Sequence, residues 1–138
     1  MRRTLFATTL LAALAVVPSA HGALRTFQTP SGNIACMIVD GRSVRCDIRQ
    51  KAWSPPPAPR SCEQDWGNGL SVGARGKGRI VCAGDTVLSP PGDPYRVLAY
   101  GKSIKVGVIT CTSRTSGLTC RNTRGGGFAL SRQSYRLF

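Results

Sequence analysis

The side chains that could carry out acid–base chemistry are mainly carboxylates. The sequence has six of them, Asp40, Asp47, Glu63, Asp65, Asp85 and Asp93. Asp65 and Asp85 form the natural pair, because each follows closely after a cysteine, and a bond between Cys62 and Cys82 would bring their neighbourhoods together. Paired carboxylates hydrolyse glycosides, so a glycan hydrolase using Asp65 and Asp85 is the enzymatic alternative. Aspartates in such turn sequences more commonly accept backbone hydrogen bonds, which is the interpretation we favour.

The N-terminus has the three-part pattern of a secretory signal peptide. Two arginines at positions 2 and 3 precede the apolar run Leu5–Val17, and small residues follow up to Gly22. The run is too short for a membrane-spanning helix. We therefore expect residues 1–22 to be cleaved, with cuts after Ala20 or Ala23 as alternatives.

Cleavage would leave residues 23–138 as a single exported domain without a membrane span. It would also remove His21, the only histidine of the chain. A chain without histidine cannot build a Ser-His-Asp triad, a Cys-His dyad or a histidine-ligated zinc centre. The sequence thereby excludes several common classes of enzyme.

Six cysteines in an exported chain predict three disulfides, because an oxidising compartment lets such bonds persist. They are Cys36, Cys46, Cys62, Cys82, Cys111 and Cys120. If Cys36 opposes Cys46 across a hairpin, the aliphatic residues two positions before and after each cysteine also form cross-strand pairs. These pairs lie on the same face of the hairpin as the two cysteines. The implied loop is 40–42, in which glycine would be favoured at the last position.

The same test pairs Cys111 with Cys120 around a four-residue loop that ends in Gly117. A left-handed backbone is expected at that glycine. In this register Asn122 opposes Ile109 and interrupts an otherwise apolar face.

Cys62 and Cys82 then pair by elimination and close the glycine-rich stretch Gly67–Gly78. A metal site would need closely spaced ligands such as Cys-x-x-Cys, and the sequence has none. We therefore expect structural disulfides, with no metal and no cofactor.

The remaining chain predicts a small all-β domain built from antiparallel hairpins. Glycine and proline turns separate short apolar segments, and no stretch after residue 22 has sustained helical periodicity. Further strands are expected at Arg79–Ala83, Tyr95–Tyr100, Ile104–Thr110 and Phe128–Leu130. At most one helical turn is expected, near Ser131–Tyr135. Within the domain, the proline-rich run 53–60 predicts a rigid, extended connector.

Arginine dominates the basic side chains. Beyond residue 22 there are 13 arginines and four lysines against six carboxylates, a net charge of +11. Arginine binds phosphate and carboxylate through a planar fork, so an anionic envelope polymer or a lipid headgroup is an expected partner, whereas nucleic acid is not. The densest acid-free cluster, interleaved with aromatic residues, is Arg121, Arg124, Arg132 and Arg136. The alternative is that this charge reflects composition and serves solubility.

Nine segments of the sequence carry a family resemblance. They are 27–36, 46–48, 53–56, 62–67, 81–86, 100–101, 117–122, 127–132 and the ending at Phe138. In these segments the chain resembles a family of small exported bacterial proteins, chiefly actinobacterial, known as a domain of unknown function. The resemblance implies no activity and no catalytic residues. It also implies that a histidine often stands where this chain has Gly126, so any chemistry of that histidine would not apply here.

We therefore expect a non-enzymatic, disulfide-stabilised β domain that is secreted or held in the cell envelope. There it would bind an anionic ligand through arginine side chains or pack against a protein partner. A third interpretation is a structural or inhibitory protein with apolar partner contacts, made through an exposed Trp53 or Trp66.

Overall fold

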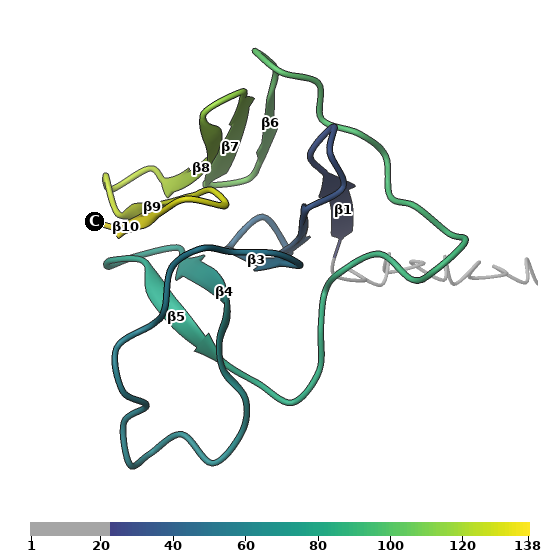
Figure 1. Cartoon of the computed structure of the whole chain (residues 1–138). Coiled ribbons are helices and arrows are strands. Elements are labelled where there is room, and N and C mark those ends of the chain that lie inside the picture. The colour runs from purple at the N-terminus through teal and green to yellow at the C-terminus, as the bar shows by residue number, and fades with distance from the viewer. Residues whose placement is uncertain (1–22) are drawn as a thin grey trace, which may run out of the picture.

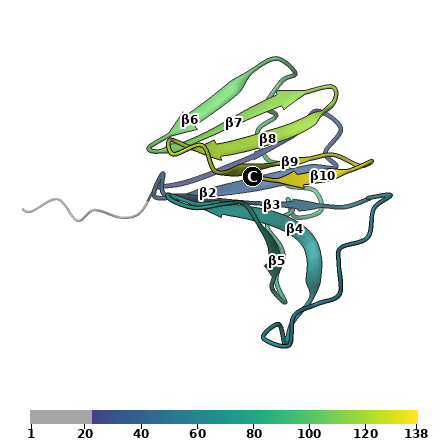
Figure 2. The ribbon, with the colours of Figure 1, turned by 90° about the vertical axis from the view of Figure 1, so that its left-hand side faces the viewer.

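The computed structural model describes residues 23–138, so the expected signal peptide lies outside the described residues. Two five-stranded antiparallel sheets pack face to face (Figures 1 and 2). The strands are β1 (Leu24–Gln28), β2 (Ile34–Val39), β3 (Ser43–Ile48), β4 (Trp66–Gly73), β5 (Arg79–Cys82), β6 (Ser103–Val106), β7 (Ile109–Arg114), β8 (Gly117–Asn122), β9 (Gly127–Leu130) and β10 (Tyr135–Leu137). The expected all-β class is confirmed. In the part of the chain that is described, no helix is long and apolar enough to cross a bilayer.

Strand order in both sheets follows the sequence. Sheet A runs β1-β2-β3-β4-β5, and sheet B runs β10-β9-β8-β7-β6. Each sheet is a meander, so every strand pairs with its sequence neighbour. The connection between the two sheets is the long segment 83–102.

The first cysteine hairpin has the predicted register. Cys36 pairs with Cys46, and the flanking aliphatic residues pair as expected. The turn differs from the expectation, because φ is positive at both Asp40 (53°) and Gly41 (63°), so glycine is not needed at the last position. Two consecutive left-handed residues match the twist of the flanking strands.

The second cysteine hairpin also has the predicted register, with Cys111 opposite Cys120. Its loop is shorter than expected, because Arg114 still pairs with Gly117 and only two residues form the turn. The predicted positive φ occurs at Gly117 (136°).

The core lies between the sheets, and two disulfides pack at its centre. The Sγ atoms of Cys46 and Cys120 are 3.9 Å apart, so the two hairpin disulfides contact each other. The third disulfide, Cys62–Cys82, lies outside this core. All three bonds join the cysteines that the hairpin registers and elimination predict. The buried side chains around the sulfurs are Phe27, Ile34, Ile38, Val44, Ile48, Leu70, Val72, Ile109, Leu118, Phe128 and Leu130.

The glycine-rich stretch Gly67–Gly78 is mostly strand β4 rather than a loop. Leu70 and Val72 alternate into the core in the usual way for a strand. Gly69 lies directly against Asp47 and the adjacent backbone, where a side chain would collide with both. Glycine here allows close backbone approach.

Two other expected elements are wrong. The expected strand Ile104–Thr110 is two strands, because the chain reverses at Gly107 (φ 57°) between β6 and β7. The expected strand Tyr95–Tyr100 forms only an isolated bridge, between Val97 and Gln28 on the edge of sheet A. No helical turn forms at Ser131–Tyr135, because the chain turns back there into β10, which pairs with β9.

One end of the sandwich is closed by contacts between glycine turns. Gly41 O accepts a hydrogen bond from Val108 N (2.8 Å), and the Cα of Gly107 lies 2.8 Å from where a Cβ on Gly41 would be. Gly126 lies against the carbonyl of Gly76, so no side chain fits there without a shift of the β4–β5 turn. A histidine in place of Gly126 would need a different turn in the facing sheet.

Asn122 belongs to this closed end and is not the interruption that the sequence suggests. Its side chain is buried, and its amide nitrogen donates to the carbonyls of Gly73 and Gly76, each at 3.0 Å. Its Oδ1 accepts the backbone N–H groups of Arg124 and Gly126. The buried amide is therefore fully bonded and joins sheet B to sheet A.

Candidate functional site

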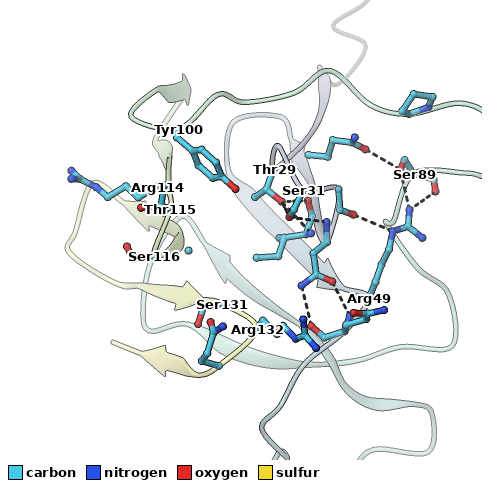
Figure 3. Close-up of a pocket in the computed structure, with 18 of the residues that line it drawn as sticks. Thr29, Ser31, Arg49, Ser89, Tyr100, Arg114, Thr115, Ser116, Ser131 and Arg132 are labelled. Carbon is cyan, nitrogen blue, oxygen red and sulfur yellow. Dashed lines mark hydrogen bonds between the residues drawn. The ribbon is translucent and has the colours of Figure 1, made fainter.

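The opposite end of the sandwich is open and holds a groove of about 900 Å³. Its walls come from the β1–β2, β7–β8 and β9–β10 turns, the end of β3 and the long connection 83–102 (Figure 3). The lining contains three arginines and many hydroxyl and amide groups, but no aspartate or glutamate. Asp93 lies in the same connection, between two lining residues, without lining the groove itself.

Arg49 is the most firmly held of these arginines. Its Nε donates to Gly32 O (3.1 Å), and its Nη2 donates to both the carbonyl oxygen and the Oγ of Ser89 (3.0 and 3.1 Å). All three acceptors are neutral. Among residues 23–138, the salt bridges involve only Arg45, so the charge of Arg49 is fixed in place without a carboxylate to offset it.

Hydrogen bonds also order the wall of the groove that sheet A provides. Asn33 and Gln50 are joined by two bonds, from Asn33 Nδ2 to Gln50 O (3.0 Å) and from Gln50 N to Asn33 Oδ1 (2.9 Å). Thr29 Oγ1 bonds with the backbone of Ile34 and lies 3.4 Å from Ser31 Oγ. These polar groups are therefore held in position before any ligand arrives.

The facing wall comes from sheet B and its loops. The hydroxyl of Tyr100, a residue that is 46% exposed, points toward Thr29 across the groove (Figure 3). Arg132 extends from the β9–β10 turn toward the sheet A wall, whereas the guanidinium of Arg114 points outward from the rim (Figure 3). The groove thus presents three cations, of which hydrogen bonds hold Arg49, beside an aromatic ring and several hydroxyls.

The four clustered arginines of the sequence do not gather in one place. Arg132 lines the groove. Arg124 lies in the β8–β9 turn at the closed end. Arg121 and Arg136 lie over the ring of Phe138, with Cζ 5.8 and 4.6 Å from its centroid. Of the interleaved aromatic residues, Phe128 is core and Tyr135 packs on Trp53, with ring centroids 4.5 Å apart.

Residues 7–138 match the model of a protein family that is described as "Family of unknown function (DUF6636)". The chain belongs to this family. No curated protein and no solved structure matches this DUF6636 chain.

The two aspartates considered for hydrolysis do not line the groove of the DUF6636 chain. Their backbones do approach, since Ala83 N donates to Asp65 O (2.9 Å) next to the Cys62–Cys82 disulfide. Asp85 lines a second hollow of about 540 Å³ on the outer side of sheet A, and Asp65 does not. Asp85 also forms an ion pair, its Oδ1 being 2.8 Å from Arg45 Nη1.

Both tryptophans have their indole N–H groups bonded to backbone. Trp53 Nε1 donates to Ser131 O (2.9 Å), and Trp66 Nε1 donates to Pro56 O (2.8 Å). Both rings are half-buried. The two indoles therefore tie the proline-rich connector 53–60 to the sandwich at its first residue, Trp53, and near its middle, at Pro56.

The Arg45 ion pairs shift the pKa values of two side chains in this DUF6636 chain, Arg45 and Asp85. For Arg45, burial opposes the charged form, but hydrogen bonds and charge from Asp47 and Asp85 outweigh it and raise the pKa of the guanidinium. The hydrogen bond and the charge of Arg45 hold the pKa of the Asp85 carboxyl below its ordinary value of 3.8. Asp85 therefore favours folding above pH 3.8, and this contribution is lost as the pH falls through the lowered pKa.

We expect the Asp85 carboxyl to titrate with a midpoint below 3.8 in the folded protein, because Arg45 stabilises the ionised form. The measurement is the carboxyl carbon chemical shift of Asp85 in an NMR pH titration. A midpoint at or above 3.8 would show that the ion pair does not persist in solution.

Sequence reasoning missed Arg49, Arg114 and Tyr100 as groove residues. The sequence did contain a signal for Arg49. When the predicted β2–β3 register is extended by one pair, Arg49 lies opposite Asn33. Tyr100 and Arg114 reach the groove only through the packing of sheet B on sheet A, which the sequence does not specify.

Proposed function

We propose that this chain is an exported, non-enzymatic binding protein that holds an acidic saccharide in the groove. The observation that carries the proposal is Arg49, a guanidinium fixed by three neutral acceptors and without a carboxylate partner. A preorganised cation of this kind offers its remaining N–H groups to a carboxylate without the cost of ordering its side chain.

The other lining groups support a saccharide as the ligand. The groove lies within the size range of small-ligand sites, roughly 300–1,000 Å³. Hydroxyl and amide groups of Ser31, Asn33, Thr115 and Ser116 can exchange hydrogen bonds with sugar hydroxyls. Tyr100 adds an exposed aromatic ring, which packs on the apolar face of a sugar.

Binding without catalysis is proposed because of the chemistry of the lining. None of the residues that line the groove is a carboxylate, a histidine or a cysteine. Export is proposed because all six cysteines are paired, a state that persists in oxidising compartments. The cell envelope or the medium is therefore the proposed location.

We expect the double variant Arg49→Gln/Arg132→Gln to bind trigalacturonate at least about tenfold more weakly than the unaltered protein, because each charge-assisted hydrogen bond contributes about 1.5–3 kcal/mol. Calorimetric titration measures the affinity. Binding should also weaken as salt rises from about 0.1 M to about 1 M.

The matched control is Arg60→Gln/Arg96→Gln, which removes the same charge from two exposed side chains that do not line the groove. The control should bind trigalacturonate as the unaltered protein does. Equal weakening of both double variants would assign the effect to net charge and refute the groove. Failure of the unaltered protein to bind would refute the acidic saccharide.

A further inference from the structure

The outer face of sheet B is a second surface that nothing in the fold covers. In Figures 1 and 2 no other segment of the described chain crosses this side of strands β6–β10. The inward residues of β7, β8 and β9 are buried in the core, and those of β6 and β10 pack against it, so the alternate residues face outward. One outward row is Arg136, Ala129, Thr119, Thr112 and Ser103, and the next is Phe138, Gly127, Arg121, Thr110 and Lys105.

Two arginines of this face are ordered by one aromatic ring. Arg136 and Arg121 lie over the ring of Phe138, with Cζ 4.6 and 5.8 Å from its centroid. Phe138 is itself held, because its main-chain oxygen accepts hydrogen bonds from Gly127 N (2.7 Å) and Gly78 N (3.0 Å). Both guanidinium groups thus lie near the same ring, and within residues 23–138 neither forms a salt bridge.

The face has no negative side chain to offset these cations. Neither outward row contains an aspartate or a glutamate, and no salt bridge within residues 23–138 involves Arg121, Arg136 or Lys105. Lys105 lies two strands away from Arg121 in the same row, roughly 10 Å along the sheet. Arg121 and Lys105 therefore lie in one row with Thr110 between them, and Arg136 lies in the neighbouring row on β10.

Between the cations lies a flat, hydroxyl-rich surface. Thr110, Thr112, Thr119 and Ser103 point outward, and the hydroxyls of Ser103 and Thr112 are 2.7 Å apart. None of the large exposed apolar residues of the described chain, Leu24, Val39, Val97 and Tyr100, lies on this face. The one large apolar side chain of the two rows is the partly buried Phe138, so the face offers a bilayer a single aromatic ring.

We propose that the outer face of sheet B binds a linear carboxylated polysaccharide that lies across the strands. Carboxylates would meet the guanidinium groups of Arg121 and Arg136 and the ammonium of Lys105. Sugar hydroxyls would meet the threonine and serine hydroxyls between them. The surface goes beyond the groove, since it shares no residue with the groove lining and would allow one chain to contact a polymer at two places.

The test compares binding of full-length polygalacturonate to the oxidised protein and to Arg121→Gln/Arg136→Gln. We expect at least about a tenfold loss of affinity in the variant, measured by surface plasmon resonance on immobilised polymer. Arg60→Gln/Arg96→Gln, which removes the same charge elsewhere, should bind as the unaltered protein does. Equal loss in both variants would overturn the proposal.

Other probes separate the polysaccharide from other anions. Neutral dextran should not bind. Polyphosphate binding that is as tight as polygalacturonate binding, and equally sensitive to the Arg121→Gln/Arg136→Gln change, would overturn the saccharide assignment. The same result with phosphatidylglycerol vesicles would instead assign the face to a membrane surface.

The two sites can fail independently. Arg121→Gln/Arg136→Gln should leave trigalacturonate binding in the groove unchanged, whereas Arg49→Gln/Arg132→Gln should leave part of the polymer binding intact. If the first variant lost trigalacturonate binding as well, its effect would be on the whole fold and the face would not be a separate site. Far-ultraviolet circular dichroism of each variant shows whether the sheets are retained.

Discussion

Replacing Asp47 by alanine is expected to lower the free energy of unfolding by about 3–5 kcal/mol, the cost of breaking a buried ion pair from one side. The Asp47 side chain is 1% exposed. Its Oδ1 accepts a hydrogen bond from Arg45 Nε (2.9 Å), and its Oδ2 accepts one from Arg45 Nη2 (2.8 Å). Oδ2 also accepts Thr86 Oγ1 and Val87 N, each at 3.0 Å. Alanine would leave the buried N–H of Val87 without an acceptor and would remove one acceptor from each of the part-buried donors of Arg45 and Thr86.

The expected loss extends beyond the ion pair. Thr86 and Val87 belong to the connection 83–102, so Asp47 fixes the start of that segment against sheet A. Farther along, Ser89 of the same segment holds Arg49 in the groove. Release of the segment should therefore also loosen the groove, and trigalacturonate binding should weaken in any Asp47→Ala protein that remains folded.

Urea unfolding followed by tryptophan fluorescence measures the change in stability. The matched control is Asp85→Ala, which removes the other carboxylate partner of Arg45 but one whose side chain is 80% exposed. Because this ion pair is exposed to solvent, its loss should lower the free energy of unfolding far less than the loss of Asp47. Equal effects of the two substitutions would refute the central role of Asp47.

The cysteine positions made much of the fold predictable. In a strand, side chains alternate, so fixing one cross-strand pair fixes all the others in that hairpin. The pairs Cys36–Cys46 and Cys111–Cys120 therefore determined two registers, and the third disulfide followed by elimination. Extending the first register by one more pair would have placed Arg49 beside Asn33, at the groove.

Sequence proximity was a poor guide to the arginine sites, for a physical reason. Four arginines, Arg121, Arg124, Arg132 and Arg136, are close in the chain, but the first is in β8 and the last is in β10, with two turns and strand β9 between them. Turns at opposite ends of the sandwich carry Arg124 and Arg132 apart, while the antiparallel pairing of β8, β9 and β10 returns Arg136 to the same face as Arg121. Which residues share a site depends on strand pairing, not on separation along the chain.

The packing roles of two glycines could not be predicted from the sequence, for a related reason. Gly69 and Gly126 lie where another part of the backbone approaches closely, so no side chain fits at either position. The backbone that excludes the side chain belongs to another strand or turn. Local sequence gives only a flexible stretch at such positions. Buried Asn122 is similar, since its acceptors Gly73 and Gly76 belong to the other sheet.

Removing the core disulfide with Cys36→Ala/Cys46→Ala is expected to lower the free energy of unfolding by about 4–5 kcal/mol. The chain-entropy model assigns about 3 kcal/mol to a closed loop of this size. The two sulfur atoms are also fully buried against the Cys111–Cys120 disulfide. Their loss removes buried volume worth roughly 1–2 kcal/mol more, by analogy with deleted methylene groups.

The comparison with Cys62→Ala/Cys82→Ala tests this reasoning. Loop length and burial make opposite predictions about which of the two disulfides stabilises the protein more. The Cys62–Cys82 bond closes the longer loop, with a sequence separation of 20 against 10, so the entropy model alone makes it the more stabilising. It lies at the surface, however, with Cys82 exposed and no core packing to lose. We expect its removal to cost about 3 kcal/mol, less than removal of the core bond, in urea unfolding of the two double variants under identical conditions. The reverse order would mean that the sulfur contact between the sheets adds nothing to stability, and that the disulfides act only by restricting the unfolded chain.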